Sequence, residues 1–221
     1  MSRKPVTNPR NYSKFTREEA EKYAETVATV FAPLYPVLAG VLVNRFGLTS
    51  GVCIDVGSGT AALAVELAKM SDMTIYAVDH ADEIQNIAEK RVTESGMEKR
   101  VKIVPADAIS LPFENNFADF IVSRGSVFFW EKLSRAFNEI YRVLKPGAYA
   151  CIGSGSGSRE IGEQVKRRML ERNPDFEKEG KERLNPSVEK RLEKGLEKSV
   201  VPRYTMKRDE TGFWITFRKE S

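Results

Sequence analysis

The chain has 221 residues, of which 41% are hydrophobic and 30% charged, a balance typical of a globular protein with one sizeable domain. Its formal net charge is only +4. The excess lies in residues 151–221, which hold 17 basic and 13 acidic side chains, against 18 of each in residues 1–150. This local excess gives no reason to expect nucleic acid as a partner, although it leaves an RNA-directed activity open as an alternative.

Composition also excludes several kinds of site and location. The longest apolar stretch, near residues 37–43, is too short to span a bilayer, and the N-terminus lacks the apolar run of a secretory signal. One histidine rules out a multi-histidine metal site, and two cysteines cannot build a disulfide scaffold. We therefore expect a cytoplasmic protein that needs no metal.

The first forty-odd residues are predicted to form two helices. Thr16 and Glu19 make a capping-box pattern, in which each side chain accepts a hydrogen bond from the backbone N–H of the other. Apolar residues follow at helical spacing, namely Ala20, Tyr23, Ala24, Val27, Val30 and Phe31. We expect Pro33 and Pro36 to break this run and a second helix to cover 37–46. The pair is either a packing element or a lid whose Tyr23 or Tyr35 closes over a ligand.

From residue 51 the pattern becomes an alternation of strands and helices. Strands are predicted at 52–56, 74–79, 101–105, 118–123 and 148–153, with helices at 60–70, 82–96 and 131–144. Such alternation predicts a parallel sheet with helices on both faces. Beyond 153 the chain is rich in charge, with helical patterns at 161–172 and 187–198 that we interpret as solvated helix faces. Residues 200–219 are predicted to form a β-hairpin around the turn 209–212.

A glycine loop lies between the first predicted strand and the following helix. Gly57, Ser58 and Gly59 allow close approach of a ligand to the backbone and to a helix N-terminus. On its own this loop is ambiguous, because Gly57-x-Gly59-x-x-Ala62 also satisfies the dinucleotide fingerprint. An NAD-dependent oxidoreductase is therefore a genuine alternative.

Acidic residues at the ends of the first three strands favour a different ligand. Asp55 precedes the loop, where it would repel a pyrophosphate but attract an ammonium group. Asp79 lies about 20 residues beyond the loop, where one carboxylate can accept both hydroxyls of a ribose. Asp107 follows the third strand, where it can accept a hydrogen bond from an adenine amine. Together they suit a cationic nucleoside with an amino-acid tail.

This pattern resembles the Rossmann-like, class I S-adenosylmethionine-dependent methyltransferases, in particular the small-molecule branch that includes the ubiquinone and menaquinone methyltransferases. The resemblance rests on CIDVGSGTAALAVELA, YAVDHADEI, IVPADAISLPFENNFADFIVS and EIYRVLKPGAYACIG. It covers about residues 48–153, and the family's closing hairpin corresponds to 200–219. It implies an α/β fold of three layers, with a seven-stranded sheet of order 3-2-1-4-5-7-6 and an antiparallel strand 7.

The resemblance also implies roles for individual residues in binding S-adenosylmethionine. Gly57, Ser58 and Gly59 would line the methionine moiety near Asp55, and Asp79 would accept from the ribose. The remaining contacts would come from His80, Asp107 and Ala108 around the adenine and from Ser123 facing the sulfonium. Two positions depart from the family pattern, Ala61 and Ala148, where relatives commonly have glycine. In the implied strand order, Cys53 and Cys151 are separated by strand four, too far for a disulfide, and are expected to be core thiols.

The segment 123–130, with its run of Phe128, Phe129 and Trp130, follows the fourth strand. These aromatic residues either anchor the next helix or form a wall for the methyl acceptor, with Arg124 pairing an anionic group. The segment lacks the Asn/Asp-Pro-Pro-aromatic motif of relatives that methylate the amines of bases. No catalytic residue is assigned, and Arg124, Tyr23 and Tyr35 are candidates for contact with the acceptor.

We therefore predict methyl transfer from S-adenosylmethionine to a small molecule by a monomer or homodimer. The expected organisation is one domain, with a helical lid at 1–47, a cofactor-binding core at 48–153 and charged helices with a hairpin at 154–221. Besides the oxidoreductase, a non-enzymatic cofactor-binding scaffold and an RNA-directed methyltransferase remain as alternatives.

Overall fold

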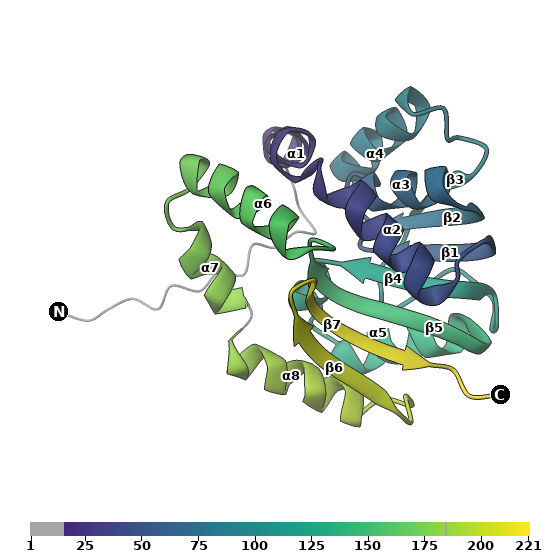
Figure 1. The fold of residues 1–221 in the computed structure, drawn as a ribbon. Coiled ribbons are helices and arrows are strands. Elements are labelled where there is room, and N and C mark those ends of the chain that lie inside the picture. Colours follow the sequence, from purple (N-terminus) through teal and green to yellow (C-terminus); the bar gives the residue numbers. More distant parts are fainter. Residues whose placement is uncertain (1–15, 184) are drawn as a thin grey trace.

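In the computed structural model, which describes residues 16–183 and 185–221, seven strands form one sheet (Figure 1). The strands are β1 Ser50–Val56, β2 Asp72–Asp79, β3 Val101–Pro105, β4 Ala118–Arg124, β5 Leu144–Gly155, β6 Tyr204–Asp209 and β7 Gly212–Arg218. Their order is β3-β2-β1-β4-β5-β7-β6. Strands β1 to β5 pair in parallel, whereas β7 is antiparallel to both of its neighbours. The predicted order and the antiparallel last strand are confirmed.

Helices cover both faces of the sheet. They are α1 Arg17–Thr26, α2 Leu34–Phe46, α3 Ala62–Met70, α4 Asp82–Glu94, α5 Leu133–Val143, α6 Arg159–Arg172, α7 Phe176–Arg183 and α8 Pro186–Glu197, with a π-helix η2 at Val27–Phe31. One hydrophobic cluster joins the sheet to α2, α3 and α4, and a second joins it to α5 and α8. In Figure 1, α2 lies in front of the sheet and α5 behind it.

Strand β4 shows how the sequence builds this double core. From Phe120 onward its successive side chains point to opposite faces, so that Phe120 and Val122 belong to the cluster under α2 and Ile121 belongs to the cluster under α5. Ala118 also belongs to the α5 cluster, because the pairing with β5 is irregular between Ala118 and Phe120 and interrupts the alternation. All four side chains are fully buried. A strand buried on both faces is apolar throughout, which is why a continuous apolar run predicted it correctly.

The N-terminal helices agree with the prediction at one end and differ at the other. The capping box of α1 is present, with the Glu19 N–H donating to Thr16 Oγ1 at 3.2 Å and the Thr16 N–H donating to Glu19 Oε2 at 2.9 Å. Pro36 does not interrupt the helix, because α2 begins at Leu34 rather than at residue 37. Pro36 lies in the first turn of this helix, where a backbone N–H has no intrahelical partner to lose.

The C-terminal third contains two differences from the prediction. Strand β5 begins at Leu144, four residues before the predicted start at 148, so residues 145–147 belong to the strand. Its pairing with β4 is irregular between Ala118 and Phe120. Helix α7 was not predicted, since its strongly polar sequence has no apolar periodicity. The closing hairpin is confirmed. Cys53 on β1 and Cys151 on β5 are free and buried on either side of β4.

Candidate functional site

The glycine loop after β1 is fastened to the end of β2. The N–H groups of Gly57 and Ser58 both donate to the carbonyl oxygen of Val78, at 2.8 and 2.9 Å. The N–H of Gly59 donates to Asp79 Oδ2 at 2.9 Å. A dinucleotide-binding loop instead turns its N–H groups towards the pyrophosphate. Because all three N–H groups donate to β2, this loop is poorly suited to a diphosphate, which argues against the oxidoreductase alternative.

A close contact with the loop after β4 explains why Gly57 is a glycine. Its φ is +69°, and a Cβ placed there would lie 2.3 Å from both Cβ and Oγ of Ser126. Ser126 is itself held in place, since its hydroxyl donates to the carbonyl of Val56 at 3.1 Å and lies 2.7 Å from the hydroxyl of Ser123. Ser123 is fully buried beneath this contact. No local pattern points to Ser126, because its hydrogen bond to Val56 joins segments 70 residues apart.

Asp55, at the end of β1, is a buried acid with one oxygen unpartnered. Its exposed fraction is 2%, and among the described residues its Oδ2 has no hydrogen-bond partner. Burial raises the pKa of this carboxyl from 3.8 to about 7; the charge of Asp79 adds to the rise and that of Arg124 opposes it. A buried carboxylate is stabilised by a cation that donates hydrogen bonds to it. The site therefore fits an ammonium group at Asp55.

Asp79 ends β2 and organises the backbone around it. Besides the bond to the glycine loop, its Oδ1 accepts from the N–H of Ala81 at 3.1 Å, and its carbonyl accepts from Gln85 Nε2 at 2.8 Å. The ring of His80 is 41% exposed, with Nδ1 at 3.9 Å from Asp79 Oδ1. Gln85 was missed by sequence analysis, because a single polar residue in the first turn of a helix gives no distinguishing signal.

Asp107 and Ala108 form a tight turn just after β3. Asp107 is exposed, and its Oδ1 accepts from the N–H of Ile109 at 3.0 Å, while its carbonyl accepts from the N–H of Ser110 at 3.0 Å. Ala108 is buried. Because β1, β2 and β3 are adjacent and parallel, Asp55, Asp79 and Asp107 all lie along one edge of the sheet, where open α/β sheets bind ligands.

Arg124 lies between two aromatic rings of the N-terminal helices. Its guanidinium carbon is 5.5 Å from the ring centroid of Phe31 and 5.4 Å from that of Tyr35, and its Nε donates to the carbonyl of Gly155 at 3.2 Å. Tyr35 is only 6% exposed, and burial raises its pKa. The structure thus brings Arg124 and Tyr35 together, and Tyr23 packs against the hydrophobic cluster that contains Tyr35.

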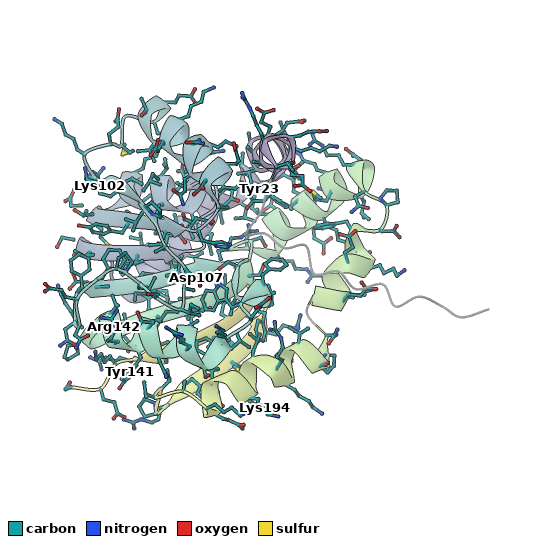
Figure 2. The ribbon with its side chains drawn as sticks, turned by 180° about the vertical axis from the view of Figure 1, so that it is seen from behind. Tyr23, Lys102, Asp107, Tyr141, Arg142 and Lys194 are labelled. Carbon is teal, nitrogen blue, oxygen red and sulfur yellow. The ribbon has the colours of Figure 1, made fainter. Side chains whose placement is uncertain are left out.

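Tyr23, labelled in Figure 2, projects from α1 and lies close to Gly59 of the glycine loop. Its hydroxyl oxygen would lie 3.1 Å from a Cβ placed on Gly59. The adjoining π-helix is held from α6, where Arg168 Nη1 donates to the carbonyl of Thr29 at 3.2 Å. Tyr23 of α1 thus lies beside the loop, and the π-helix is fastened to α6, the helix that follows β5.

A hollow of about 650 Å³ lies among α6, α7, α8 and β6, away from the three acids. Its lining includes Lys166, Lys181 and Arg208. These cations are paired, since Glu177 lies 3.2 Å from Lys166 Nζ and 3.3 Å from Lys181 Nζ, and Arg208 contacts Glu189. We assign no ligand to this hollow.

Two further observations apply to residues 16–183 and 185–221. No single helix there is long and apolar enough to cross a membrane, and the pair 17–31 and 34–46, bent by 72°, meets that test only when its two members are counted together. Within the same residues, no group of three or more His, Cys, Asp or Glu side chains is arranged to hold a metal ion.

Comparison with known proteins gives matches to part of the chain and to its full length. A family model described as a methyltransferase domain matches residues 54–152. A crystal structure from Methanococcus maripaludis, described as a candidate S-adenosyl-L-methionine-dependent methyltransferase, is 38% identical, with a TM-score of 0.90. That match covers 100% of this chain and 98% of the other.

Two curated relatives match less than half of this chain. The 2-methyl-6-phytyl-1,4-hydroquinone methyltransferase of Arabidopsis thaliana is 36% identical over 102 residues, and a ubiquinone/menaquinone biosynthesis C-methyltransferase of Rickettsia prowazekii is 30% identical over 105. Each match covers 45% of this chain, but only 28% and 42% of the relatives' own lengths. Together with the full-length match and the strand order, these similarities show that the chain belongs to the class I S-adenosylmethionine-dependent methyltransferases.

Proposed function

We propose that this protein transfers a methyl group from S-adenosylmethionine to a small-molecule acceptor. The observation that carries the proposal is the buried, unpartnered oxygen of Asp55 at the sheet edge that also holds Asp79 and Asp107. A cationic nucleoside with an amino-acid tail supplies an ammonium, a ribose and an amine-bearing base, one group for each of these acids.

The proposed binding roles follow from the geometry of the loop. Asp55 would accept from the ammonium group, and the backbone of Gly57, Ser58 and Gly59 would line the methionine moiety. Asp79 would accept from the ribose hydroxyls, because a carboxylate has more lone pairs than its two backbone N–H donors use. Assigned with them are His80, Asp107 and Ala108 around the adenine and Ser123 beneath the sulfonium side.

The chemistry places few demands on this chain's own side chains. When bound, S-adenosylmethionine supplies an activated methyl group that a nucleophile of the acceptor displaces in line, leaving S-adenosylhomocysteine. What the protein contributes is alignment and exclusion of water, so we assign no general base. Tyr23, Tyr35 and Arg124 are proposed to face the acceptor, with Arg124 and the rings packed against it forming part of the wall.

The activity is tested by incubating the purified chain with S-adenosylmethionine labelled on its methyl group. Suitable acceptors are a fractionated metabolite extract and a panel of hydroquinones, the substrate class in the name of the Arabidopsis relative. We expect label to pass to an organic-soluble or small polar product. Absence of transfer to every fraction, despite tight binding of S-adenosylhomocysteine, would favour a non-enzymatic scaffold, and transfer to RNA alone would favour an RNA-directed enzyme.

Asp79→Asn is expected to weaken S-adenosylhomocysteine binding by about tenfold to a hundredfold, because an amide nitrogen cannot accept the hydrogen bonds that the carboxylate accepts. It should also lower the melting temperature, since one of the bonds to Gly59 and Ala81 is lost. Asp72→Asn, the same substitution at an exposed acid at the other end of β2, serves as the control and should change affinity by less than about threefold. Calorimetric titration of both variants checks this, and equal losses would show that Asp79 has no special part in binding.

We further propose that the chain forms one domain, with residues 1–47 as a lid, 48–153 as the cofactor-binding core and 154–221 as charged helices and a hairpin on the acceptor side. Residues 1–15 of this lid lie outside the residues that the structure describes. Its location is proposed to be the cytoplasm and its state a monomer or homodimer. Light scattering coupled to gel filtration tests the latter, and a larger assembly would contradict it. Limited proteolysis tests the lid, which should become protected when S-adenosylhomocysteine binds.

A further inference from the structure

Two of the sequence motifs on which the resemblance rests, residues 103–123 and residues 139–153, are joined in the structure by an ionic clamp. Arg142 makes a bidentate pair with Glu139, in which its Nε donates to Oε1 and its Nη2 to Oε2, both at 2.8 Å. Each partner then reaches the loop after β3. The Leu111 N–H donates to Glu139 Oε2 at 3.0 Å, and Arg142 Nη2 donates to the Leu111 carbonyl at 3.1 Å.

The same guanidinium holds the next residues of that loop. Arg142 Nη1 donates to the carbonyl of Phe113 at 2.8 Å and to Asn115 Oδ1 at 3.0 Å. The loop is fixed from its other side by aromatic packing, since the rings of Phe113 and Phe117 stack at 5.0 Å and both meet Tyr76 of β2 edge-on. A planar fork of donors is needed to reach so many acceptors at once, and arginine provides it where lysine does not.

The clamp is also tied to the end of the chain. Lys219, just beyond β7, donates from Nζ to the carbonyl of Arg142 at 3.0 Å and to Asn116 Oδ1 at 2.8 Å. The Asn116 N–H donates to the same Arg142 carbonyl at 3.1 Å. Hydrogen bonds from Arg142 lower the pKa of Glu139, so the pair remains ionised at neutral pH. Hydrogen bonds from Glu139, Arg142 and Lys219 thus hold the loop 111–117 at several points along its length.

What the clamp positions is the turn that precedes it. Leu111 has both its N–H and its carbonyl held by the pair, and Ser110 before it forms a β-bridge with Asp107. Leu111 and Ala108 are buried in one cluster, so the four-residue turn is fixed at its base while Asp107 stays exposed at its rim.

We propose that Glu139 and Arg142 are positioning residues that set the selectivity for adenine by holding the turn that carries Asp107. This inference rests on the proposed function, in which Asp107 accepts from the adenine amine. Neither residue touches the base. Their effect is on the direction of one carboxylate, so loosening the clamp should reduce discrimination between bases more than it reduces binding as a whole.

The test compares the dissociation constants of S-adenosylhomocysteine and S-inosylhomocysteine, whose base lacks the amine. For the wild type we expect a preference of about tenfold or more for the adenine compound. Arg142→Lys keeps the charge but loses the fork, and Glu139→Gln keeps the shape but loses the charge; each should reduce the preference to about threefold or less. Arg135→Lys, an exposed arginine on the same helix, is the matched control and should keep the full preference. Asp107→Ala should abolish the preference, and adding Arg142→Lys to it should change nothing more.

Three results would overturn the inference. The first is an Arg142→Lys or Glu139→Gln protein that melts at a lower temperature and binds both ligands more weakly by the same factor, as a merely structural role predicts. The second is a wild type that binds S-adenosylhomocysteine with no preference over the inosyl analogue, which leaves the proposed function standing. The third, no binding of either compound by the wild type, would instead remove the proposed function itself.

Discussion

Asp55→Asn is expected to make the free protein more stable at pH 8 and at the same time to weaken S-adenosylhomocysteine binding by about a hundredfold. The stability effect follows from the raised pKa of this acid. A carboxyl with a pKa of about 7 in the folded chain and 3.8 in the unfolded chain holds its proton more tightly when folded. Folding stability is therefore lost as pH rises from about 4 to 7, and the loss is complete at pH 8.

The size of the stability change is bounded by the same shift. A rise from 3.8 to about 7 corresponds to about 4 kcal/mol at most. The asparagine amide still has to be buried, so we expect Asp55→Asn to gain about 1–3 kcal/mol at pH 8 and little at pH 4. For a chain of this length the melting temperature should rise by about 3–10 °C.

The loss of binding arises because the charge on Asp55, which destabilises the free protein, would be favourable once an ammonium group pairs with it. An ionised Asp55 has a buried oxygen without a described partner, and an ammonium group would neutralise and hydrogen-bond it. Removing one member of a buried charge pair costs about 2–5 kcal/mol, hence the factor of about a hundred. Asp72→Asn, an exposed acid at the start of β2, is the control and should alter neither property. Calorimetry with and without ligand measures both, and a less stable Asp55→Asn protein at pH 8 would contradict the electrostatic explanation.

Gly57→Ala is expected to have the largest effect of any single methyl group added to the site. Its Cβ would lie 2.3 Å from Cβ of Ser126, and the φ of +69° is unfavourable for alanine. Ser126 cannot move aside without breaking its hydrogen bonds to Val56 and Ser123. We expect a loss of about 2–4 kcal/mol in the free energy of unfolding and of more than a hundredfold in S-adenosylhomocysteine affinity.

Two further variants separate the clash from the backbone strain. Gly96→Ala adds a methyl group at a similar φ of +66° where no atom lies within 4 Å, so it should cost only about 1–2 kcal/mol and leave binding intact. The double variant Gly57→Ala with Ser126→Gly removes the colliding side chain and should recover part of both losses. Chemical denaturation and ligand titration measure these effects. Equal effects of Gly57→Ala and Gly96→Ala would mean that the contact with Ser126 is unimportant.

The fold could be predicted from the sequence because each strand of the parallel sheet has a local sequence pattern. An apolar run such as 52–56, followed by glycines and a helix-forming segment, predicts a buried parallel strand without knowledge of its neighbours. The hairpin at residues 200–219 was likewise predictable from a local pattern, the turn at 209–212 between two strand-like segments. Pro36 and α7 were missed because one depends on its position within a helical turn and the other has no apolar face.

The site was predictable to the extent that strand ends meet at one edge of a sheet. This rule brings together Asp55, Asp79 and Asp107, which are far apart in sequence. It does not tell that one Asp55 oxygen is left without a partner, that Ser126 fits against Gly57, or that Arg142 reaches across to the loop after β3. These depend on side-chain packing between distant segments, which no local pattern encodes.

The central claim is that Asp55 receives the ammonium group of the cofactor, and titration of the wild type with S-adenosylhomocysteine at pH 6 and pH 8 tests it most directly. We expect micromolar binding that tightens by about tenfold between the two pH values as Asp55 loses its proton, with no such change in Asp55→Asn. NAD, titrated under the same conditions, should not bind. Binding of NAD but not of S-adenosylhomocysteine, or an affinity that is the same at both pH values, would contradict the account.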